Sequence, residues 1–336
     1  DLGYEVDLLP VKKMGEHFKA LSKQVRGVDL KRGHALSCLP ALVSYLRKET
    51  PSAFFAAKDR CNQTALLARA LSGRQIPVAV RLGTNRSEAM QGDIVIKRWW
   101  RSLVSRYAYS LADSVIAVSS GVAEDTAALT GIPREQIKVI PNPVITSNME
   151  RMANEALNHP WFDCSQTPVI LACGRLTRQK GFSTLIKAFA LASKRRTLRL
   201  MILGEGRKRQ ELEALIHDLG LKAEVQLPGF VSNPYPYMQK ASLFVLSSLW
   251  EGSPNVLTEA MALGTSVVAT DCPSGPRELL QGGTYGPLVP VGDEQAMAEA
   301  ILNTLENPLQ PRVLKDAVKP YRAEISAQTY LRAVGL

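Results

Sequence analysis

Residues 169–182 read VILACGRLTRQKGF, and the fold class of the chain follows from this stretch. The five apolar residues 169–173 have the length of a buried strand, and Gly174 ends the run. A stripe of apolar side chains at helical spacing begins at Phe182. A strand, a loop between glycines and a helix form the first part of a right-handed β-α-β unit. The stretch therefore predicts an α/β fold built on a parallel sheet.

The same alternation of strands and helices continues along the whole chain. In the second half, further strand-length apolar runs lie at 198–203, 224–227, 243–246, 266–269 and 287–291. In the first half, strands are expected at 4–9, 53–56, 77–82, 114–117 and 137–140, and helices near 13–26, 36–48, 62–72, 97–112 and 120–130. We therefore predict two parallel α/β domains facing a deep cleft, with ligands bound beyond the carboxyl ends of the strands.

The composition is that of a large soluble globular protein. The chain has 336 residues, 46% of them hydrophobic and 21% charged, so it can bury the cores of two domains. A run of about 18 apolar residues and a secretory leader are both absent, which predicts that the chain does not span a membrane. Its five cysteines are widely spaced without a C-x-x-C pair, which argues against a disulfide framework or structural zinc and favours a reducing cytoplasm.

Composition also indicates the domain boundaries. Four prolines between residues 141 and 168, without strong periodicity, mark the segment 146–167 as an interdomain linker. The linker separates an N-terminal domain, 1–145, from a C-terminal domain, 168–310. The remaining residues, 311–336, contain an amphipathic stretch that is expected to pack as a helix near the domain junction.

The basic excess of the chain lies in its first half. Residues 1–145 hold 21 Lys and Arg against 13 Asp and Glu, whereas the remaining residues hold 20 against 18. This asymmetry favours an anionic partner such as acidic lipid, nucleic acid or phosphate, although an ordinary solvated face would carry the same charges. Basic residues and Trp99 and Trp100 are the candidate contacts with an anionic membrane. The basic residues are Lys12, Lys13, Lys19, Lys23, Arg26, Lys31, Arg32, Lys97, Arg98 and Arg101.

The loop 174–181 has the features of a diphosphate-binding site. Gly174 and Gly181 allow tight turns, the following helix presents free backbone N–H groups, and Arg175 and Lys180 add cationic donors. Neither G-x-x-x-x-G-K nor G-x-G-x-x-G occurs, which argues against nucleotide hydrolysis by a P-loop and against NAD chemistry. Surface cations near a helix start are the plainer interpretation.

A second motif lies at residues 251–263. Pro254 suits the first position of a helix and Ser253 a cap, which predicts a helix over 255–263 ended by Gly264. Glu251 then precedes the helix and Glu259 lies within it. Both carboxylates can face a ligand at the helix N-terminus and accept paired hydrogen bonds from the vicinal hydroxyls of a sugar or a ribose.

These two motifs resemble those of a known enzyme family. The spacing of Glu251 and Glu259 is similar to the E-x7-E motif of the retaining, nucleotide-sugar-dependent glycosyltransferases of family 4, also called group 1, which have the GT-B fold. The loop 174–182 resembles their G-R-L-x-x-Q-K-G-F phosphate loop, and 204–206 resembles a small glycine loop near the donor. Residues 118–122, 139–144, 159–162 and 271–279 add to the resemblance, the last two to the branch that extends lipid-linked or cell-surface glycans.

The resemblance implies two Rossmann-like domains and a role for each matched residue. Arg175, Lys180 and Glu251 would be catalytic, the two cations by stabilising the leaving UDP and the carboxylate by contacting the transferred sugar. Glu259 would hold the ribose, and Phe230 and Val231 would lie near the uracil. The donor-binding set implied in this way is Gly174, Gly204, Phe230, Val231, Ser253, Pro254, Asn255, Val256 and Glu259.

The implied reaction needs neither a side-chain nucleophile nor a metal. The acceptor attacks from the face that the nucleoside diphosphate leaves, with the leaving phosphate as base, so configuration is retained. The sequence has no D-x-D, the spacing by which other glycosyltransferases hold a divalent ion, and no cofactor is expected.

The chain departs from the family pattern in two places. The family normally begins with a strand, a glycine-rich turn and a helix before the strand at 4–9, so the N-terminal domain is expected to lack its first strand and helix. Many relatives also carry a His within the segment that corresponds to 81–86, and Asn85 is the expected substitute on the acceptor side.

The sequence therefore predicts a glycosyltransferase that moves a hexose or N-acetylhexosamine from a UDP-sugar to a lipid-linked or surface-glycan acceptor. The expected location is the cytoplasm, at the inner face of the cytoplasmic membrane, with no nucleic-acid partner. Two alternatives stay open: a UDP-N-acetylglucosamine epimerase of the same fold, and a non-enzymatic basic binding protein.

Overall fold

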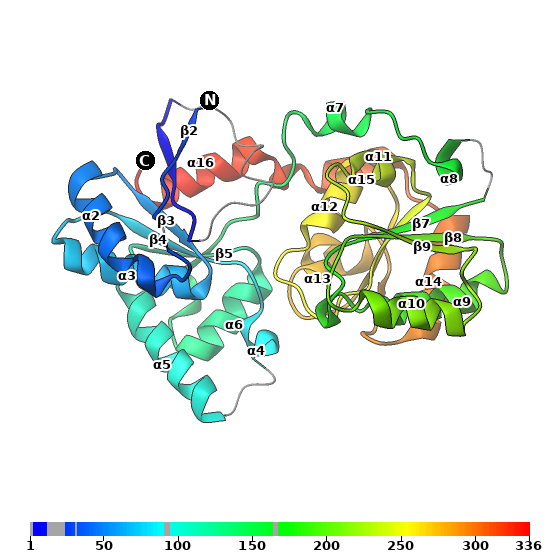
Figure 1. Ribbon diagram of the computed structural model, residues 1–336, viewed down its shortest axis with the longest axis horizontal. Helices are drawn as coiled ribbons and strands as arrows, with labels where there is room; N and C mark the ends of the chain where they lie inside the picture. The colour runs from blue at the N-terminus through cyan, green and yellow to red at the C-terminus, as the bar shows by residue number, and fades with distance from the viewer. Residues whose placement is uncertain (1–2, 12–23, 31, 91–94, 164–166) are drawn as a thin grey trace.

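The computed structural model describes residues 3–11, 24–30, 32–90, 95–163 and 167–336, with residues 95–98 described by their backbone alone (Figure 1). Two α/β domains lie side by side, with the blue and cyan N-terminal domain on the left and the green, yellow and orange C-terminal domain on the right. The red helix α16 (Ala323–Ala333) belongs to the end of the chain but lies against the N-terminal domain (Figure 1).

The C-terminal domain contains a six-stranded parallel sheet with the strand order β12-β11-β10-β7-β8-β9. Its strands are almost wholly apolar because helices cover both faces, as parallel sheets require. The strands are β7 (Val169–Cys173), β8 (Arg199–Leu203), β9 (Val225–Gly229), β10 (Leu243–Leu246), β11 (Val267–Thr270) and β12 (Leu288–Val289).

Two hydrophobic clusters fill the C-terminal domain, one on each face of the sheet. The first is formed with α9 (Phe182–Ser193), α10 (Arg209–Asp218) and α14 (Glu294–Glu306). The second is formed with the helices on the opposite face of the sheet. These are α7 (Met149–Ala153), α8 (Pro160–Asp163), α11 (Tyr235–Lys240), α12 (Asn255–Ala262), α13 (Pro276–Leu279) and α15 (Pro311–Ala317).

The N-terminal domain contains a four-stranded parallel sheet with the order β3-β4-β5-β6 and a separate parallel pair, β1-β2. The strands are β1 (Val6–Leu8), β2 (Val25–Gly27), β3 (Phe54–Ala57), β4 (Val78–Leu82), β5 (Ser114–Ala117) and β6 (Ile137–Val139). The helices are α2 (Leu39–Glu49), α3 (Asp59–Ser72), α4 (Arg86–Ala89), α5 (Val95–Ser110) and α6 (Ser120–Thr130). Side chains of α3, α5 and α6 cover one face of the four-stranded sheet, and Tyr330 and Ala333 of α16 pack on the other.

The predicted alternation is observed in both domains, with one correction near the N-terminus. The helix expected near 13–26 does not reach its predicted end, because Val25–Gly27 form β2 and pair with β1. The remainder of that expected helix, with Lys12, Lys13, Lys19 and Lys23, lies outside the described residues, as does Lys31.

The chain crosses between the domains twice, at adjacent places. Residues 142–146 lead into the C-terminal domain, and residues 321–323 lead back. The two crossings pair with each other: the Ile145 amide donates to the Tyr321 carbonyl at 3.0 Å, and the Ala323 amide donates to the Ile145 carbonyl at 2.9 Å. Within the segment expected as a linker, α7 and α8 pack into the core of the C-terminal domain through Met149 and Trp161.

Candidate active site

The site is built at the point where the strand order of the C-terminal sheet reverses. The chain moves outward from β7 through β8 and β9, then returns to the other side of β7 to form β10. Loops that follow the two strands at such a switch point diverge and leave a crevice, where ligands of open α/β sheets bind. Lys180 lies in the connection after β7, and Glu251 lies in the connection after β10.

The two side chains meet in the structure. The Lys180 Nζ donates to Glu251 Oε1 at 2.6 Å, and the Ser248 hydroxyl donates to the same oxygen, also at 2.6 Å. The side chains of Lys180 and Glu251 are 14% and 8% exposed, so the pair is largely removed from water. A buried, charge-assisted contact of this kind fixes both groups before any ligand arrives.

Glycine allows the two connections to approach each other closely. Gly181 has a φ of +59°, and a Cβ placed there would lie 2.1 Å from the Ser247 carbonyl oxygen. The Ser247 hydroxyl in turn donates to the Lys180 carbonyl at 2.8 Å. The backbone contact therefore sets the position of Lys180 against the β10 connection, and only glycine fits at residue 181.

The floor of the site is made by two further glycines. The Gly174 amide donates to the Leu203 carbonyl at 2.9 Å, and the Gly204 amide donates to the Gly229 carbonyl at 2.7 Å. A Cβ on Gly204, whose φ is +137°, would lie 2.0 Å from the Gly174 carbonyl oxygen. The aliphatic part of Lys180 passes over Gly174, while the Arg175 side chain is exposed.

The helix α12 begins at Asn255, as the sequence predicts, but its cap lies one residue later than expected. Its N-cap is Pro254, without a side-chain capping hydrogen bond, and Asn255 is its first residue, so Ser253 is not the cap. Pro254 is buried against Gly275, whose added Cβ would lie 2.7 Å from the Pro254 Cδ. This packing leaves Asn255 exposed and Val256 half-buried at the start of the helix.

Glu259 lies deeper in the same helix and has a very different environment from Glu251. Burial raises the pKa of Glu259 to about 7. Cys173, at the end of β7, has a pKa raised to about 12, chiefly by burial and then by the charge of Glu259. The same carboxylate contributes to raising the pKa of Tyr235 to about 12, after burial. Glu259 thus faces the end of β7 and the start of α11.

Other expected site residues lie at the rim. Phe230, directly after β9, is 55% exposed, and Val231 is half-buried beside the α11 side of the core. Asn85 belongs to the N-terminal domain, where its side-chain oxygen caps α4 by accepting from the Glu88 amide at 3.0 Å. Asn85 Nδ2 donates to the Ser274 hydroxyl of the C-terminal domain at 3.0 Å, so Asn85 spans the cleft.

Further contacts join the two domains around the site. The Ser119 hydroxyl donates to the Gly252 carbonyl at 2.7 Å. A Cβ on Gly252 would lie 2.3 Å from the Gly83 carbonyl oxygen, so the backbones of the two domains touch next to Glu251. At the rim, the Ser120 amide at the start of α6 donates to the Glu278 carboxylate at 2.8 Å.

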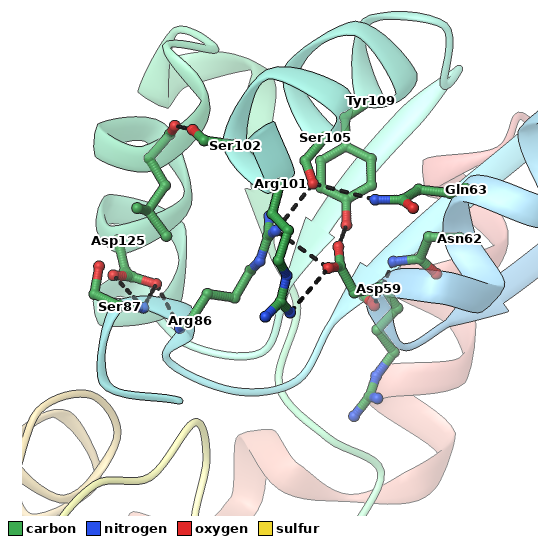
Figure 2. Close-up of polar contacts among 12 residues, drawn as sticks. Asp59, Asn62, Gln63, Arg86, Ser87, Arg101, Ser102, Ser105, Tyr109 and Asp125 are labelled. Atoms are coloured by element: carbon green, nitrogen blue, oxygen red, sulfur yellow. Dashed lines mark hydrogen bonds and ion pairs between the residues drawn. The ribbon is translucent and has the colours of Figure 1, made fainter. Parts of the chain in front are cut away.

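Behind Asn85, a buried polar cluster fixes the N-terminal wall of the cleft (Figure 2). The Arg86 guanidinium donates to Asp59 at 3.2 Å and to the Ser105 hydroxyl at 2.9 Å. The Tyr109 hydroxyl donates to the other Asp59 oxygen at 2.5 Å, and burial raises the pKa of Tyr109. The Arg86 amide donates to Asp125 at 2.7 Å, so the loop after β4 is held on both sides.

The sequence analysis did not identify every residue that shapes the site. It missed Ser248, whose position directly after an apolar strand was an available signal, and Ser119 and Glu278, which act across the cleft. It also missed Asn142, which donates to Asn255 of the other domain, and Arg81, which donates to Asn142. Within the described parts of the chain, no three His, Cys, Asp or Glu side chains are grouped where a metal ion could bind.

Comparisons with known proteins match both halves of the chain. A family model described as Glycosyltransferase Family 4 matches residues 1–148, and one described as Glycosyl transferases group 1 matches residues 167–307. The chain is 33% identical over 269 residues to the N-acetylgalactosamine-N,N'-diacetylbacillosaminyl-diphospho-undecaprenol 4-alpha-N-acetylgalactosaminyltransferase of Campylobacter jejuni, covering 79% of this chain and 70% of that protein. It is 32% identical over 225 residues to the lipopolysaccharide core biosynthesis glycosyltransferase LpsE of Rhizobium meliloti, covering 66% of this chain and 63% of that protein.

Solved structures share the fold. Anabaena HepE in complex with UDP and glucose has a TM-score of 0.76 at 19% identity, covering 98% of this chain and 92% of that chain. The lipopolysaccharide outer core galactosyltransferase WaaB in its apo form has a TM-score of 0.69 at 22% identity, covering 96% and 87%. These likenesses confirm the predicted architecture, two Rossmann-like domains of the GT-B type.

Proposed function

This chain belongs to the glycosyl transferases group 1 family, and on that premise we propose that it moves a hexose or an N-acetylhexosamine from a UDP-sugar to a lipid-linked or surface-polysaccharide acceptor. The names of two relatives support the acceptor class: one names a diphospho-undecaprenol-linked sugar, the other the lipopolysaccharide core. The titles of two structural neighbours that name UDP support the nucleotide.

The observation that carries the proposal is the Lys180–Glu251 pair at the switch point of the C-terminal sheet. The ammonium of Lys180 lies 2.6 Å from the carboxylate, within a loop of glycines that brings backbone close to any ligand. A diphosphate that enters here exchanges partners with this pair: its oxygens take the Lys180 ammonium, and Glu251 turns to accept hydrogen bonds from sugar hydroxyls.

The proposed reaction retains the anomeric configuration. An acceptor hydroxyl approaches the anomeric carbon on the face from which UDP departs, the glycosidic C–O bond forms as the bond to the phosphate oxygen breaks, and the hydroxyl proton moves to that phosphate oxygen. Negative charge develops on the leaving UDP, and the positive charges of the largely buried Lys180 and the exposed Arg175 stabilise it. Their two positive charges let the reaction proceed without a metal ion or other cofactor.

The nucleoside portion of the donor is assigned to the rim of the C-terminal domain. Glu259, half-buried near the end of β7, accepts hydrogen bonds from the ribose diol once it is ionised. Phe230 and Val231, which follow β9, provide apolar contact for uracil. The α12 N-terminus, with Ser253 to Val256, lies beside the phosphates and the sugar, where its backbone N–H groups favour negative charge.

The proposed acceptor side includes a membrane surface on α5. Its outward side chains are apolar and strongly exposed: Trp99 by 59%, Trp100 by 56% and Tyr107 by 72%, whereas Ser105 and Tyr109 of the same helix are buried. Leu103, Val104 and Leu111 continue the exposed stripe, defined here as the α5 face. Trp and Tyr side chains favour the interface between water and lipid.

Charge makes an anionic bilayer the proposed partner of the α5 face. Arg101 and Arg106 flank it, and Lys97 and Arg98 precede the two tryptophans in the sequence. In Figure 1, α5 extends along the outer surface of the N-terminal domain beside α4 and α6. We assign the protein on this basis to the inner face of the cytoplasmic membrane, without a nucleic-acid partner. None of the helices in the described parts of the chain is both long and apolar enough to cross a membrane.

The test is calorimetric titration of UDP with EDTA present, followed by sugar transfer to lipid-linked acceptors. We expect micromolar to sub-millimolar binding by the parent chain, weakened at least tenfold in Lys180→Ala and in Glu259→Ala. Lys187→Ala is the matched control, because Lys187 pairs with Glu294 at 2.8 Å on the surface and lies outside the site.

The outcomes separate the alternatives. A folded parent chain that binds no UDP overturns the proposed donor. Binding of UDP without sugar transfer to any acceptor, together with epimerisation of UDP-N-acetylglucosamine, supports the same-fold epimerase. Affinity for polyanions that falls steeply with salt, without affinity for UDP, supports the non-enzymatic basic protein.

A further inference from the structure

A line of hydrogen bonds connects α16, the helix after the second crossing between the domains, to the start of α12. Tyr330 belongs to α16, the helix that follows the second crossing; Arg81 belongs to β4; Asn142 begins the first crossing; and Asn255 is the first residue of α12. These four residues come from four separate segments of the chain. The hydrogen bond between Asn142 and Asn255 is the one that passes from the N-terminal to the C-terminal domain.

The contacts along this line are direct. Arg81 Nε donates to the Tyr330 hydroxyl at 3.0 Å, and Arg81 Nη2 donates to Asn142 Oδ1. Asn142 Nδ2 donates to Asn255 Oδ1 at 2.7 Å. Asn142 is only 8% exposed and Arg81 is half-buried, whereas Asn255 is exposed at the start of α12.

Chemistry fixes the direction of these hydrogen bonds. A guanidinium has donors and no acceptor, so the Asn142 atom that faces Arg81 must be its carbonyl oxygen. The amide nitrogen of Asn142 then faces Asn255 and donates, so the Asn255 atom that receives it must be an oxygen. Both N–H bonds of Asn255 are consequently left to donate to another group.

We propose that Arg81 and Asn142 are positioning residues that orient the Asn255 amide so that its N–H groups donate to a phosphate or sugar oxygen of the bound donor. The inference rests on the proposed function, because it concerns the same donor site. Asn142 and Asn255 lie on different domains, so the orientation exists only while the domains are closed as in this structure. Asn255 is therefore oriented to bind the donor only when the two domains are closed.

Asn142→Asp is the sharpest test, because aspartate has nearly the shape of asparagine. The variant still accepts from Arg81 but cannot donate to Asn255, and the Asn255 amide loses its fixed orientation. We expect UDP-sugar affinity to fall about fivefold to tenfold and KM to rise by a similar factor, as for the loss of one ordinary hydrogen bond. The melting temperature is expected to change by no more than a few degrees.

A double-mutant cycle tests whether the loss of UDP-sugar affinity in Asn142→Asp acts through the Asn255 side chain. In an Asn255→Ala background, Asn142→Asp should produce no further loss of UDP-sugar affinity, since the group that it orients is gone. Arg81→Lys, which keeps a cationic donor to Asn142, should retain most of the affinity that Arg81→Met loses. Asn307→Asp, on the surface of the C-terminal domain, is the matched control.

Two results overturn the inference, and they are distinguishable. If the parent chain binds no UDP or UDP-sugar, the proposed function fails and the inference fails with it. If the parent binds, but Asn142→Asp leaves affinity unchanged or lowers it equally with and without the Asn255 side chain, the inference alone fails, and Asn142 has a purely structural role.

Discussion

Glu251 and Glu259 are eight residues apart in the sequence, yet their carboxyl groups meet opposite surroundings. One carboxylate oxygen of Glu251 accepts hydrogen bonds from the Lys180 ammonium and the Ser248 hydroxyl, each at 2.6 Å. Glu259 is half-buried in α12, and desolvation of its carboxyl group raises its pKa to about 7. Glu251 is therefore paired with a cation, whereas Glu259 changes its charge near neutral pH, and in the proposed donor site this makes UDP binding sensitive to pH.

We predict that UDP affinity increases as the pH rises through about 7, because the ionised Glu259 carboxylate is the form that accepts hydrogen bonds from the ribose. Binding at pH 6.5 should release part of a proton, measured by calorimetry in buffers of different ionisation enthalpy. Glu259→Gln should remove both the pH dependence and the proton release. Proton release that persists in this variant would assign the titration to another group.

The raised pKa of Glu259 also predicts how the free energy of unfolding depends on pH. Its pKa is about 7 in the folded chain and near 4.5 when solvated, so the folded state binds the proton more tightly. Its contribution is therefore fully present below about pH 4.5 and is lost as the pH rises through 7, by up to about 3 kcal/mol. Glu259→Gln should flatten the decline in the free energy of unfolding between pH 5 and 8, measured by urea denaturation. A decline of unchanged slope would contradict the assignment.

Gly204 carries a separate stability prediction. Gly204→Ala should lower the free energy of unfolding by about 2 kcal/mol or more, since the added methyl would lie 2.0 Å from the Gly174 carbonyl oxygen in a backbone region with φ +137°. Gly292→Ala is the control for backbone strain alone, because its φ is +81° and its added Cβ meets nothing within 4 Å. Similar losses in the two variants would show that the contact with Gly174 is unimportant.

At the scale of elements, α5 is the helix whose exposed surface most needs an explanation. Three of its outward side chains, Trp99, Leu103 and Tyr107, recur at intervals of four residues and form one apolar face. Trp99 and Trp100 contact each other edge to face, with ring centroids 5.6 Å apart. A soluble domain gains nothing from exposing such a row unless another surface covers it.

We predict that replacing both Trp99 and Trp100 with Ser weakens binding to phosphatidylglycerol-containing vesicles about tenfold, measured by sedimentation. UDP affinity should not change, because α5 lies outside the donor site. Leu309→Ser with Val313→Ser is the control, since these residues are 38% and 40% exposed on the C-terminal domain. Equal binding of the parent to anionic and neutral vesicles, or equal loss in the control, would falsify the assignment of this face.

The elements that the sequence predicted correctly have strong and local signals. In the C-terminal domain, β7 and β10 are unbroken apolar runs that Gly174 and Ser247 follow directly, and β7 has the predicted bounds. The β2 strand was missed because three residues, Val25–Gly27, are too short to show a period, and their state depends on pairing with β1. The α12 cap was misplaced because buried contact with Gly275 makes Pro254 the N-cap.

At the scale of the molecule, the site depends on contacts that no single segment contains. Lys180 and Glu251 could be found from the sequence because each lies in a recognisable loop after a strand. Arg81, Asn142 and Glu278 could not, because their partners belong to the other domain or to the returning C-terminal helix. Which loops face each other across a cleft is a property of domain packing, and the spacing of residues within one segment does not encode it.

The contact between Glu278 and α6 makes a last prediction, about the balance between open and closed domains. The carboxylate receives the Ser120 amide at 2.8 Å at the N-terminus of α6, where a negative charge is favoured. Glu278→Gln keeps the size but removes the charge, which should favour opening by about 1 kcal/mol and increase the radius of gyration in X-ray scattering without ligand. Saturating UDP should move the value back toward that of the parent, because the inferred orientation of Asn255 by Asn142 makes the closed form bind the donor more tightly. Glu299→Gln is the control, since Glu299 pairs with Arg195 within the C-terminal domain. If Glu278→Gln scatters like the parent at every UDP concentration, this contact does not hold the domains together, and Ser119, Asn85 and Asn142 remain as the contacts that do.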